Sequence, residues 1–454
     1  MAELQFREAL RQAIDEEMET DDTVFVMGEE VAEYDGAYKV TEGLLDKYGF
    51  RRVIDTPISE LGFAGIGVGA AMNGLRPIVE FMTFNFAVLA ADQIINHASK
   101  ARYMLGGQVS TPIVFRGPNA SAGQLGATHS VAYDSMYAMF PGLKIIYPSE
   151  PDDAKGLLKS AIRDDDPVLF MESEQMYGLK GEVSDSEDYT IPIGKGKIKR
   201  EGDDVTIVAT GKMYHIAKNA AKELAKDGTE AEIIDPRTIK PLDIEMIIES
   251  VKKTNRCVVV DESHPFGGLA SEVGFLIQRE AFDYLDAPVQ RVTLPDVNAP
   301  FSKPLFDFFL PSFLSIPSRI GSKDFFSLSL SFSSFFSAFS SSESDLDSVS
   351  APESPRRSLI SSPSSPIIAI VPPRGTASPS LTSIFKIVPS SNTSTSIVAL
   401  SVSTSAITSP DLTLSPSFTF QEAITPSSMV SLSFGISIFS AIVSQFVNYL
   451  YKYY

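Results

Sequence analysis

Short apolar runs alternate with amphipathic segments along the first part of the chain. Residues 3–20 carry apolar side chains at helical spacing, which predicts an opening helix. The apolar run 23–27 is stopped by Gly28, Glu29 and Glu30, as expected of a buried parallel strand with polar residues at its carboxyl end. The alternation then predicts strands at 76–81, 111–116, 143–148 and 167–171, and helices at 62–74, 85–103 and 152–163. Strands that alternate with helices are typical of a doubly wound parallel sheet.

A second alternation of the same kind follows a stretch rich in Gly, Ser, Asp and Lys. It predicts strands at 205–209, 230–235, 256–261 and 289–292, and helices at 213–226, 244–254 and 269–281. The fold class is therefore α/β, with two doubly wound domains. We expect the first domain over residues 1–178, a linker over 179–202 and the second domain over 203–307.

The composition changes after residue 307. Between 308 and 454 serine is abundant, charged residues are sparse, and no sustained period appears, so this tail does not specify a packed core. The uncharged stretch 423–451 is long enough to cross a membrane, but its serines, Pro426, Gln445 and Asn448 argue against a span. We interpret the tail as an irregular, Ser-rich segment that is either disordered or read in the wrong frame, and favour the second hypothesis.

Charge and cysteine content narrow the functional classes. The net charge of −19, with no Lys/Arg-rich run, argues against nucleic-acid binding through phosphates. The only cysteine, Cys257, lies in an apolar strand, so no intrachain disulfide can form and a reducing cytoplasm is expected. The first residues are acidic and amphipathic, unlike a secretory signal or an Arg-rich transit peptide.

One candidate for chemistry is Glu60, which precedes a glycine-rich run. Ser59 offers a capping hydroxyl, and Gly65, Gly69 and Asn73 recur at spacing four, which predicts a closely packed helix with a small face. A carboxylate at the start of such a helix would be poorly hydrated and would need a partner. The alternative is that Glu60 only favours the positive end of the helix dipole.

Five runs of the sequence, in this order and spacing, carry a resemblance to a known family. They are residues 27–31, 52–60, 74–86, 126–130 and 235–243. Through them the first 305 or so residues closely resemble the beta subunits of the decarboxylating component of pyruvate dehydrogenase, a thiamine-diphosphate enzyme. The resemblance implies a pyrimidine-binding domain followed by a transketolase-type C-terminal domain, and covers about two thirds of the chain.

The resemblance also implies roles for particular residues. Glu60 would hydrogen-bond the aminopyrimidine ring of thiamine diphosphate, which activates the cofactor for attack on a 2-oxo acid. Glu29 would lie near the same edge of the cofactor, and Phe86 would pack on the aminopyrimidine. Without the resemblance Glu29 is an ordinary solvated acid and Phe86 a core residue.

His129 is one of four histidines and follows a Gly-rich loop. The resemblance implies that it donates a proton when the acyl group passes to the lipoyl group of the acyltransferase, a task that suits an imidazole. The alternative is a structural histidine, as we expect for His97, His215 and His264. Residues 133–137 depart from the family pattern, which leaves the details of lipoyl access open.

Metal sites follow only from the family. Relatives bind potassium through main-chain oxygens and a carboxylate, and the matching positions are Ile113, Ala161, Ile162, Asp164 and Asp166. The alternative is a solvated turn at a helix end, and Asp166 replaces an Asn familiar at that place. The chain has no Gly-Asp-Gly motif for the diphosphate and Mg²⁺. In the family, an alpha subunit binds the diphosphate and Mg²⁺, and the two kinds of subunit form an α₂β₂ heterotetramer.

The function implied is the beta subunit of the thiamine-diphosphate enzyme that decarboxylates pyruvate and passes the acetyl group to dihydrolipoyl acetyltransferase. Partners would be the alpha subunit and the lipoyl and subunit-binding domains of that acyltransferase. A branched-chain 2-oxo-acid or acetoin dehydrogenase would share Glu60 and His129, although residues 80–84 favour pyruvate. A third alternative is an inactive scaffold, because the usual final helix after residues 302–307 is missing and docking to the acyltransferase could fail.

Overall fold

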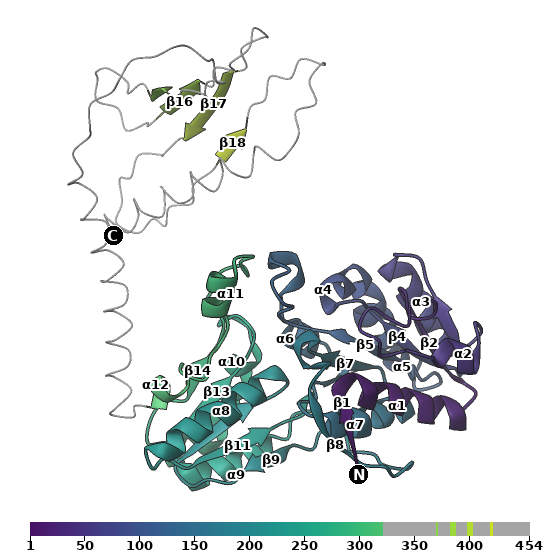
Figure 1. Cartoon of the computed structure of the whole chain (residues 1–454), viewed down its shortest axis with the longest axis horizontal. Helices are drawn as coiled ribbons and strands as arrows, with labels where there is room; N and C mark the ends of the chain where they lie inside the picture. Colours follow the sequence, from purple (N-terminus) through teal and green to yellow (C-terminus); the bar gives the residue numbers. More distant parts are fainter. Residues whose placement is uncertain (321–368, 371–381, 387–396, 403–417, 421–454) are drawn as a thin grey trace, which may run out of the picture. The chain divides into compact units, whose positions relative to one another are not determined.

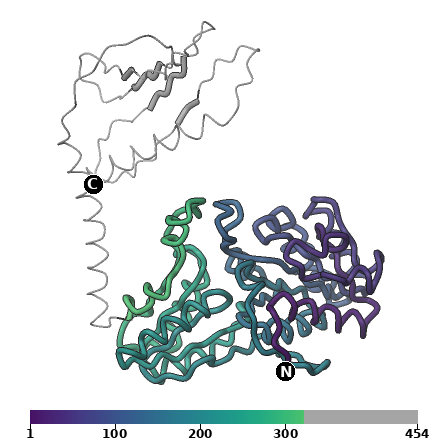
Figure 2. The backbone as a smooth tube through the Cα atoms, viewed as in Figure 1, coloured from purple at the N-terminus to yellow at the C-terminus, as the bar shows by residue number. Residues whose placement is uncertain are grey.

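The computed structural model describes residues 1–320 and four short segments of the tail, 369–370, 382–386, 397–402 and 418–420. The chain divides after Asp347 into two compact units. The first unit contains both predicted α/β domains, which Figure 2 shows as consecutive stretches of the chain, purple to blue and then teal to green. Two doubly wound domains are therefore confirmed.

The first domain is built on a seven-stranded sheet with the order β12-β6-β7-β5-β4-β2-β3. Its central strands β7, β5, β4 and β2 are labelled in Figure 1. All neighbouring strands are parallel except β12, which runs antiparallel to β6. The strands of this sheet are β2 (Val24–Gly28), β3 (Val53–Asp55), β4 (Arg76–Glu80), β5 (Val114–Pro118), β6 (Lys144–Ile146), β7 (Val168–Glu172) and β12 (Thr238–Lys240). From β2 the chain goes to β3 on one side and then to β4 on the other. This is a topological switch point, where ligands bind outside the carboxyl ends of the strands.

Helices cover both faces of this sheet. They are α1 (Phe6–Thr20), α2 (Leu44–Tyr48), α3 (Glu60–Met72), α4 (Phe84–Ala87), α5 (Ser99–Met104), α6 (Asp134–Ala138) and α7 (Pro151–Arg163). One buried core lies under α1 and α7, which pack side by side in Figure 1, and a second lies under α3 and the segment that follows β4.

The single helix predicted over residues 85–103 is wrong. The segment is divided into α4, a 3₁₀ turn (Val88–Ala90), a π-helix (Gln93–Ala98) and α5. The turn and the π-helix both pack against α3, and the Gln93 side chain lies close to Gly65 of that helix. Tertiary packing therefore overrides the regular 3.6-residue period here.

The second domain has a five-stranded sheet with the order β14-β13-β10-β11-β9. Its strands are β9 (Lys197–Arg200), β10 (Val205–Ala209), β11 (Ala231–Asp235), β13 (Cys257–Val260) and β14 (Gln290–Val292), and its main helices are α8 (Lys212–Lys226), α9 (Ile244–Thr254) and α10 (Leu269–Ala281). The antiparallel β9 lies in the stretch predicted as linker. So does β8 (Lys180–Val183), which pairs with β1 (Ala2–Gln5).

The packed chain continues past residue 307, where the sequence predicted that the second domain ends. Helix α11 (Lys303–Phe309) buries Phe309. Ile316, which precedes the short α12 (Pro317–Ile320), lies in the same hydrophobic core as residues of α8.

The second unit contains a four-stranded antiparallel sheet, β15 (Ala369–Ile370), β16 (Thr382–Lys386), β17 (Ile397–Val402) and β18 (Phe418–Phe420). These strands interrupt the segment predicted to be irregular, and most of that segment, including residues 423–451, lies outside the described residues. Within the described part of the chain, no helix is long and apolar enough to span a membrane.

Candidate functional site

Glu60 is the first residue of α3, at the carboxyl side of β3. The helix begins here because the Ser59 carbonyl accepts hydrogen bonds from the Gly62 and Phe63 amides, at 2.9 and 3.0 Å. The predicted capping by the Ser59 hydroxyl is wrong, since that hydroxyl makes no cap hydrogen bond and lies beside Gly62. The side chain of Glu60 is 6% exposed, so its carboxylate is poorly hydrated, as predicted.

Glu29 follows β2 and is 7% exposed. Its Oε1 atom is buried and has no hydrogen-bond partner among the described residues. Burial raises the pKa of Glu29 above its usual range, and the negative charge of Glu60 raises it further. The structure thus brings the two carboxyl groups together and leaves an acceptor that a ligand N–H group could satisfy.

Phe86 and His129 form a second pair. Phe86 lies in α4 after β4, and His129 ends the 3₁₀ turn Ala127–His129 in the loop after β5. Their rings meet edge to face with centroids 4.9 Å apart, and both side chains are half-buried. The loop is tied to α4 because Asn85 Oδ1 accepts a hydrogen bond from the Val131 amide at 3.0 Å.

The four residues share one location in the sheet. Glu60, Glu29, Phe86 and His129 follow β3, β2, β4 and β5 respectively, and these four strands are consecutive neighbours. Because parallel strands end at the same edge, all four side chains come from the edge that contains the switch point. An acidic pair and an aromatic–imidazole pair there could bind a flat, nitrogen-containing ring and hold a proton beside it.

A buried ionic triad beneath this edge was missed by the sequence analysis. Arg116 of β5 donates to both carboxylate oxygens of Glu172, at 2.8 and 2.6 Å, and also to Glu80. Burial raises the pKa of Glu80, which the Arg116 charge opposes. The only signal in the sequence is a charged residue within or at the end of each of three mostly apolar strands, Glu80 in β4, Arg116 in β5 and Glu172 in β7. The triad fastens the carboxyl ends of β4, β5 and β7 that support the site.

The five positions matched to a potassium site lie around the end of α7. The carbonyl oxygens of Ile162 and Asp164 each accept a hydrogen bond from Arg76 Nη1 at 3.0 Å. Lys144 Nζ lies 2.7 Å from both carboxylate oxygens of Asp164, and Arg102 Nη1 lies 2.6 Å from Asp166 Oδ1.

At the remaining two positions, the carbonyl oxygens of Ile113 and Ala161 accept hydrogen bonds from the backbone amides of Val168 and Asp164, at 2.9 and 3.3 Å. A potassium ion would therefore have to share oxygens already bound to three cationic side chains, so this donor set does not fit a further cation as it stands. Potassium binding stays a prediction.

The other three histidines have structural neighbours. His215 Nε2 donates to the Ser149 carbonyl at 2.7 Å, His264 Nδ1 to the Pro295 carbonyl at 3.0 Å, and His97 Nε2 lies 3.3 Å from Asp92. Burial lowers the pKa of His215. None of the three contacts the four residues at the switch point among the described contacts.

Comparison with known proteins places this geometry in context. Residues 2–180 match the family profile "Transketolase, pyrimidine binding domain", and residues 194–316 match "Transketolase, C-terminal domain". A solved structure titled "Split gene transketolase, inactive beta4 tetramer" superposes with a TM-score of 0.58 at 24% identity, covering 70% of this chain and 97% of that one. It shows that the fold is shared.

Three relatives of higher identity are named as beta subunits of the pyruvate dehydrogenase E1 component. The chain is 56% identical over 306 residues to "Pyruvate dehydrogenase E1 component subunit beta" of Rickettsia bellii, covering 67% of this chain and 94% of the relative. It is 54% identical over 312 residues to the protein of that name in Rhizobium meliloti, covering 69% and 68%. A mitochondrial relative from Oryza sativa, subunit beta-2, is 55% identical over 304 residues, covering 66% and 81%.

Proposed function

This chain belongs to the family of pyruvate dehydrogenase E1 component beta subunits, and from that premise we propose that it supplies the pyrimidine-binding half of a site that decarboxylates pyruvate. The observation that carries the proposal is the buried pair Glu29 and Glu60, with an unpartnered acceptor oxygen at the switch point. A family of thiamine-diphosphate enzymes needs such acceptors beside the aminopyrimidine ring.

Thiamine diphosphate, when bound, supplies a carbon nucleophile and an electron sink for the loss of carbon dioxide from a 2-oxo acid. Glu60 would hold a proton on a pyrimidine ring nitrogen, because a buried carboxylate interacts strongly with a cationic N–H group. The free Oε1 of Glu29 would accept a further hydrogen bond, and Phe86 would offer an apolar surface to the ring.

His129 would act at the transfer of the acetyl group to the lipoyl arm. Its ring is half-buried against Phe86, and its Nδ1 lies 2.9 Å from the Thr128 hydroxyl. An imidazole can hold and release a proton near neutral pH, which is what protonation of a departing group requires.

The rest of the site would come from other chains. We place the diphosphate and Mg²⁺ on an alpha subunit, in an α₂β₂ assembly, because this sequence has no Gly-Asp-Gly motif. Three apolar residues are at least half-exposed: Ile58, just before α3, and Leu61 and Ile66 in that helix. Exposed apolar side chains of this kind are expected on a surface that a partner covers. The lipoyl and subunit-binding domains of the acetyltransferase are the further partners, and a cytoplasmic location agrees with the single buried Cys257.

The test is Glu60→Gln in the chain assembled with its alpha subunit. The amide keeps the size of the side chain but loses the charge, so decarboxylation should fall at least about 100-fold while the heterotetramer still forms. Glu33→Gln, at an exposed acid of the loop after β2, is the matched control and should retain full activity. Near-normal turnover of Glu60→Gln would sink the assignment.

Substrate choice needs a separate measurement. Rates on pyruvate and on 3-methyl-2-oxobutanoate should be compared with the same assembled enzyme. A preference for the branched substrate would replace pyruvate by a branched-chain 2-oxo acid without changing the role of Glu60.

A further inference from the structure

Residues of the second domain contact the loop 119–133 of the first domain, which contains His129. Lys212, at the start of α8, and Glu262, just after β13, form a buried ion pair with Nζ and Oε1 2.5 Å apart. Both bind Ser121 of the first domain. Lys212 Nζ donates to Ser121 Oγ at 2.6 Å, while the amide of Ser121 donates to Glu262 Oε1 at 3.2 Å and its hydroxyl donates to the same oxygen.

The ends of this loop are fixed within the first domain. The Asn119 amide donates to the Glu172 carbonyl at 2.8 Å, and Asn119 Oδ1 accepts from the Tyr133 amide at 2.9 Å. Between these two ends lie Ser121 and His129. The intervening residues contact the first domain near His129, at the Phe86 ring and at Asn85 Oδ1, and the second domain at Ser121, so the position of His129 depends on both sets of contacts.

Further contacts of the middle of the loop also come from the second domain. Gln124 Nε2 donates to the Phe301 carbonyl at 3.2 Å, and the Phe301 ring packs directly on Gly126, where φ is +79° and a Cβ atom would collide with the ring. Ala120 and Gln124 have φ values of +64° and +61°, a region that ordinary side chains rarely adopt. A loop with this backbone needs outside contacts to keep its conformation.

A buried ion pair contributes little net stability, because the cost of desolvating two charges offsets their attraction. Its stronger effect is on geometry, since each charged group requires its partners in place. The Lys212–Glu262 pair has a single first-domain partner among the described hydrogen bonds of its side chains, and that partner is Ser121.

We propose that Lys212 and Glu262 are positioning residues that place His129, through Ser121, for transfer of the acetyl group to the lipoyl arm. The role given to His129 is the one in the proposed function, on which this inference rests. Loosening the pair should impair transfer far more than decarboxylation, because Glu29, Glu60 and Phe86 lie outside this loop, after β2, in α3 and in α4.

The experiment uses the heterotetramer with Lys212→Met, Lys212→Arg or Ser121→Ala. Decarboxylation is followed with an artificial electron acceptor, and transfer is followed as reductive acetylation of a free lipoyl domain. For Lys212→Met the ratio of transfer to decarboxylation should fall at least about tenfold, since small displacements of a catalytic group are costly. Lys212→Arg, which keeps the charge, should restore most of the ratio. Ser121→Ala should lower the ratio in the same direction.

Hydrogen–deuterium exchange gives a readout that does not depend on activity. Amides of residues 119–133 should exchange faster in Lys212→Met than in the unaltered protein, without the cofactor as well as with it. Exchange in α3 should not change, because none of the described hydrogen-bond or ion-pair partners of Lys212 and Glu262 lies in that helix.

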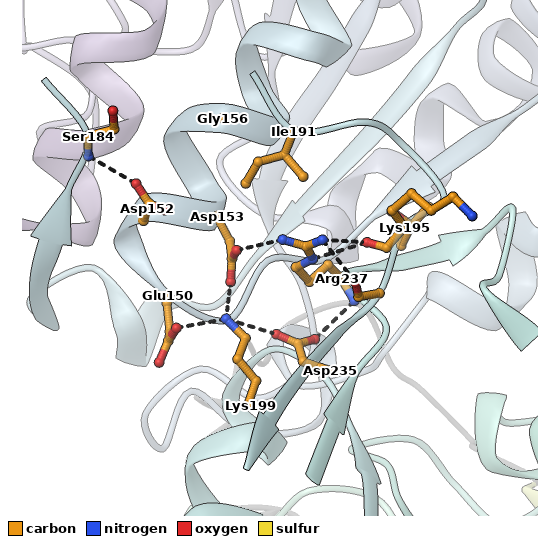
Figure 3. Close-up of polar contacts among 12 residues, drawn as sticks. Glu150, Asp152, Asp153, Gly156, Ser184, Ile191, Lys195, Lys199, Asp235 and Arg237 are labelled. Atoms are coloured by element: carbon orange, nitrogen blue, oxygen red, sulfur yellow. Dashed lines mark hydrogen bonds and ion pairs between the residues drawn. The ribbon is translucent and has the colours of Figure 1, made fainter. Parts of the chain in front are cut away.

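A second ionic cluster between the domains provides the control (Figure 3). Lys199 of β9 lies 2.7 Å from Glu150, contacts Asp153 of α7, and lies 3.8 Å from Asp235. Arg237 Nη1 donates to Asp153 at 3.0 Å. Lys199→Met removes a buried interdomain lysine as Lys212→Met does, but its contacts do not include residues 119–133. It should lower thermal stability and leave both the activity ratio and the exchange of the loop unchanged.

Different outcomes test the proposed function and the positioning role of Lys212 and Glu262 separately. An unaltered heterotetramer with no activity on pyruvate would refute the proposed function itself. With that activity present, an unchanged ratio in both Lys212→Met and Ser121→Ala would overturn the positioning role, as would an equal fall in both steps or the same effect in Lys199→Met. If Lys212→Met fails to assemble, Ser121→Ala, which keeps both charges, decides the question alone.

Discussion

At the scale of single residues, two buried carboxyl groups keep their protons to near neutral pH. Burial raises the pKa of Asp134 to about 7, and the charge of Asp261 adds to the effect. Burial also raises the pKa of Asp235 to about 7, where the Lys199 charge opposes the shift and Asp153 adds to it. In the unfolded chain both would titrate near pH 4. Each therefore contributes stability at low pH that is lost as pH rises through about 7.

Asp134→Asn should remove this dependence for one group. We expect the urea-unfolding midpoint of the variant minus that of the unaltered chain to increase from pH 5.5 to pH 8. The increase should correspond to about 1–2 kcal/mol in the free energy of unfolding. The sign follows because the unaltered carboxyl must ionise in a buried place above pH 7, whereas the amide cannot. Asp227→Asn, at an exposed acid, should show no such change. An equal response of the two variants to pH would contradict the assignment.

The residues of the site were not equally predictable. Glu60 could be located from the residues around it that signal the start of a helix. The role predicted for it came only from the family resemblance, as did the roles predicted for Glu29, Phe86 and His129. The partners Glu80, Arg116, Ser121, Lys212 and Glu262 could not be found, because each pairs with residues remote in sequence. The period of apolar residues indicates which side of a helix or strand is buried, but it does not identify the side chains of other elements that pack against that side.

At the scale of elements, α3 shows what spacing can and cannot determine. Gly65, Gly69 and Asn73 predicted one small, closely packed face, yet the closest approach is at Gly67. A Cβ atom there would lie 2.7 Å from Val79 Cγ2 of β4 and 3.2 Å from Ile113 Cδ1. A Cβ atom at Gly69 would meet nothing within 4 Å in the described chain. The sequence indicated a small-residue helix, but its orientation on the sheet depends on the tertiary packing.

This difference predicts opposite effects of two like substitutions. Gly67→Ala should destabilise the chain by about 1–3 kcal/mol, because the methyl group overpacks the boundary with the sheet. Gly69→Ala should leave stability unchanged or raise it by up to about 1 kcal/mol, through the better helix propensity of alanine. Thermal unfolding of the full-length variants, followed by circular dichroism, measures both. The reverse order of the two melting temperatures would show that α3 lies otherwise on the sheet.

At the scale of the whole molecule, the alternation of strands and helices was enough to predict two doubly wound domains. It missed the short strands β1, β3, β8, β9 and β12, because each is only three or four residues long. It also could not show that β12 leaves the second domain to extend the sheet of the first. The end of the second domain was set by composition at residue 307, although apolar residues beyond that point are buried.

The end of the second domain can be tested by truncation. Phe309 is 3% exposed, and Ile316 is fully buried in the same hydrophobic cluster as Met213 and Leu224 of α8. A chain cut after residue 307 loses both side chains, and burying such groups is worth about 2–5 kcal/mol each. It should therefore melt several degrees below a chain cut after residue 320. Phe309→Ala in the longer chain should reproduce part of the loss, whereas Phe308→Ala, at a side chain that is 86% exposed, should not.

The same pair of chains tests docking to the acetyltransferase. If the second domain docks the subunit-binding domain, the chain that ends at residue 320 should be captured by it, since its packing is intact. The chain that ends at 307 should be captured less well, because loss of Phe309 and Ile316 loosens the second domain. Equal melting temperatures and equal capture of the two chains would show that residues 308–320 are not part of the domain, and would restore the boundary suggested by composition.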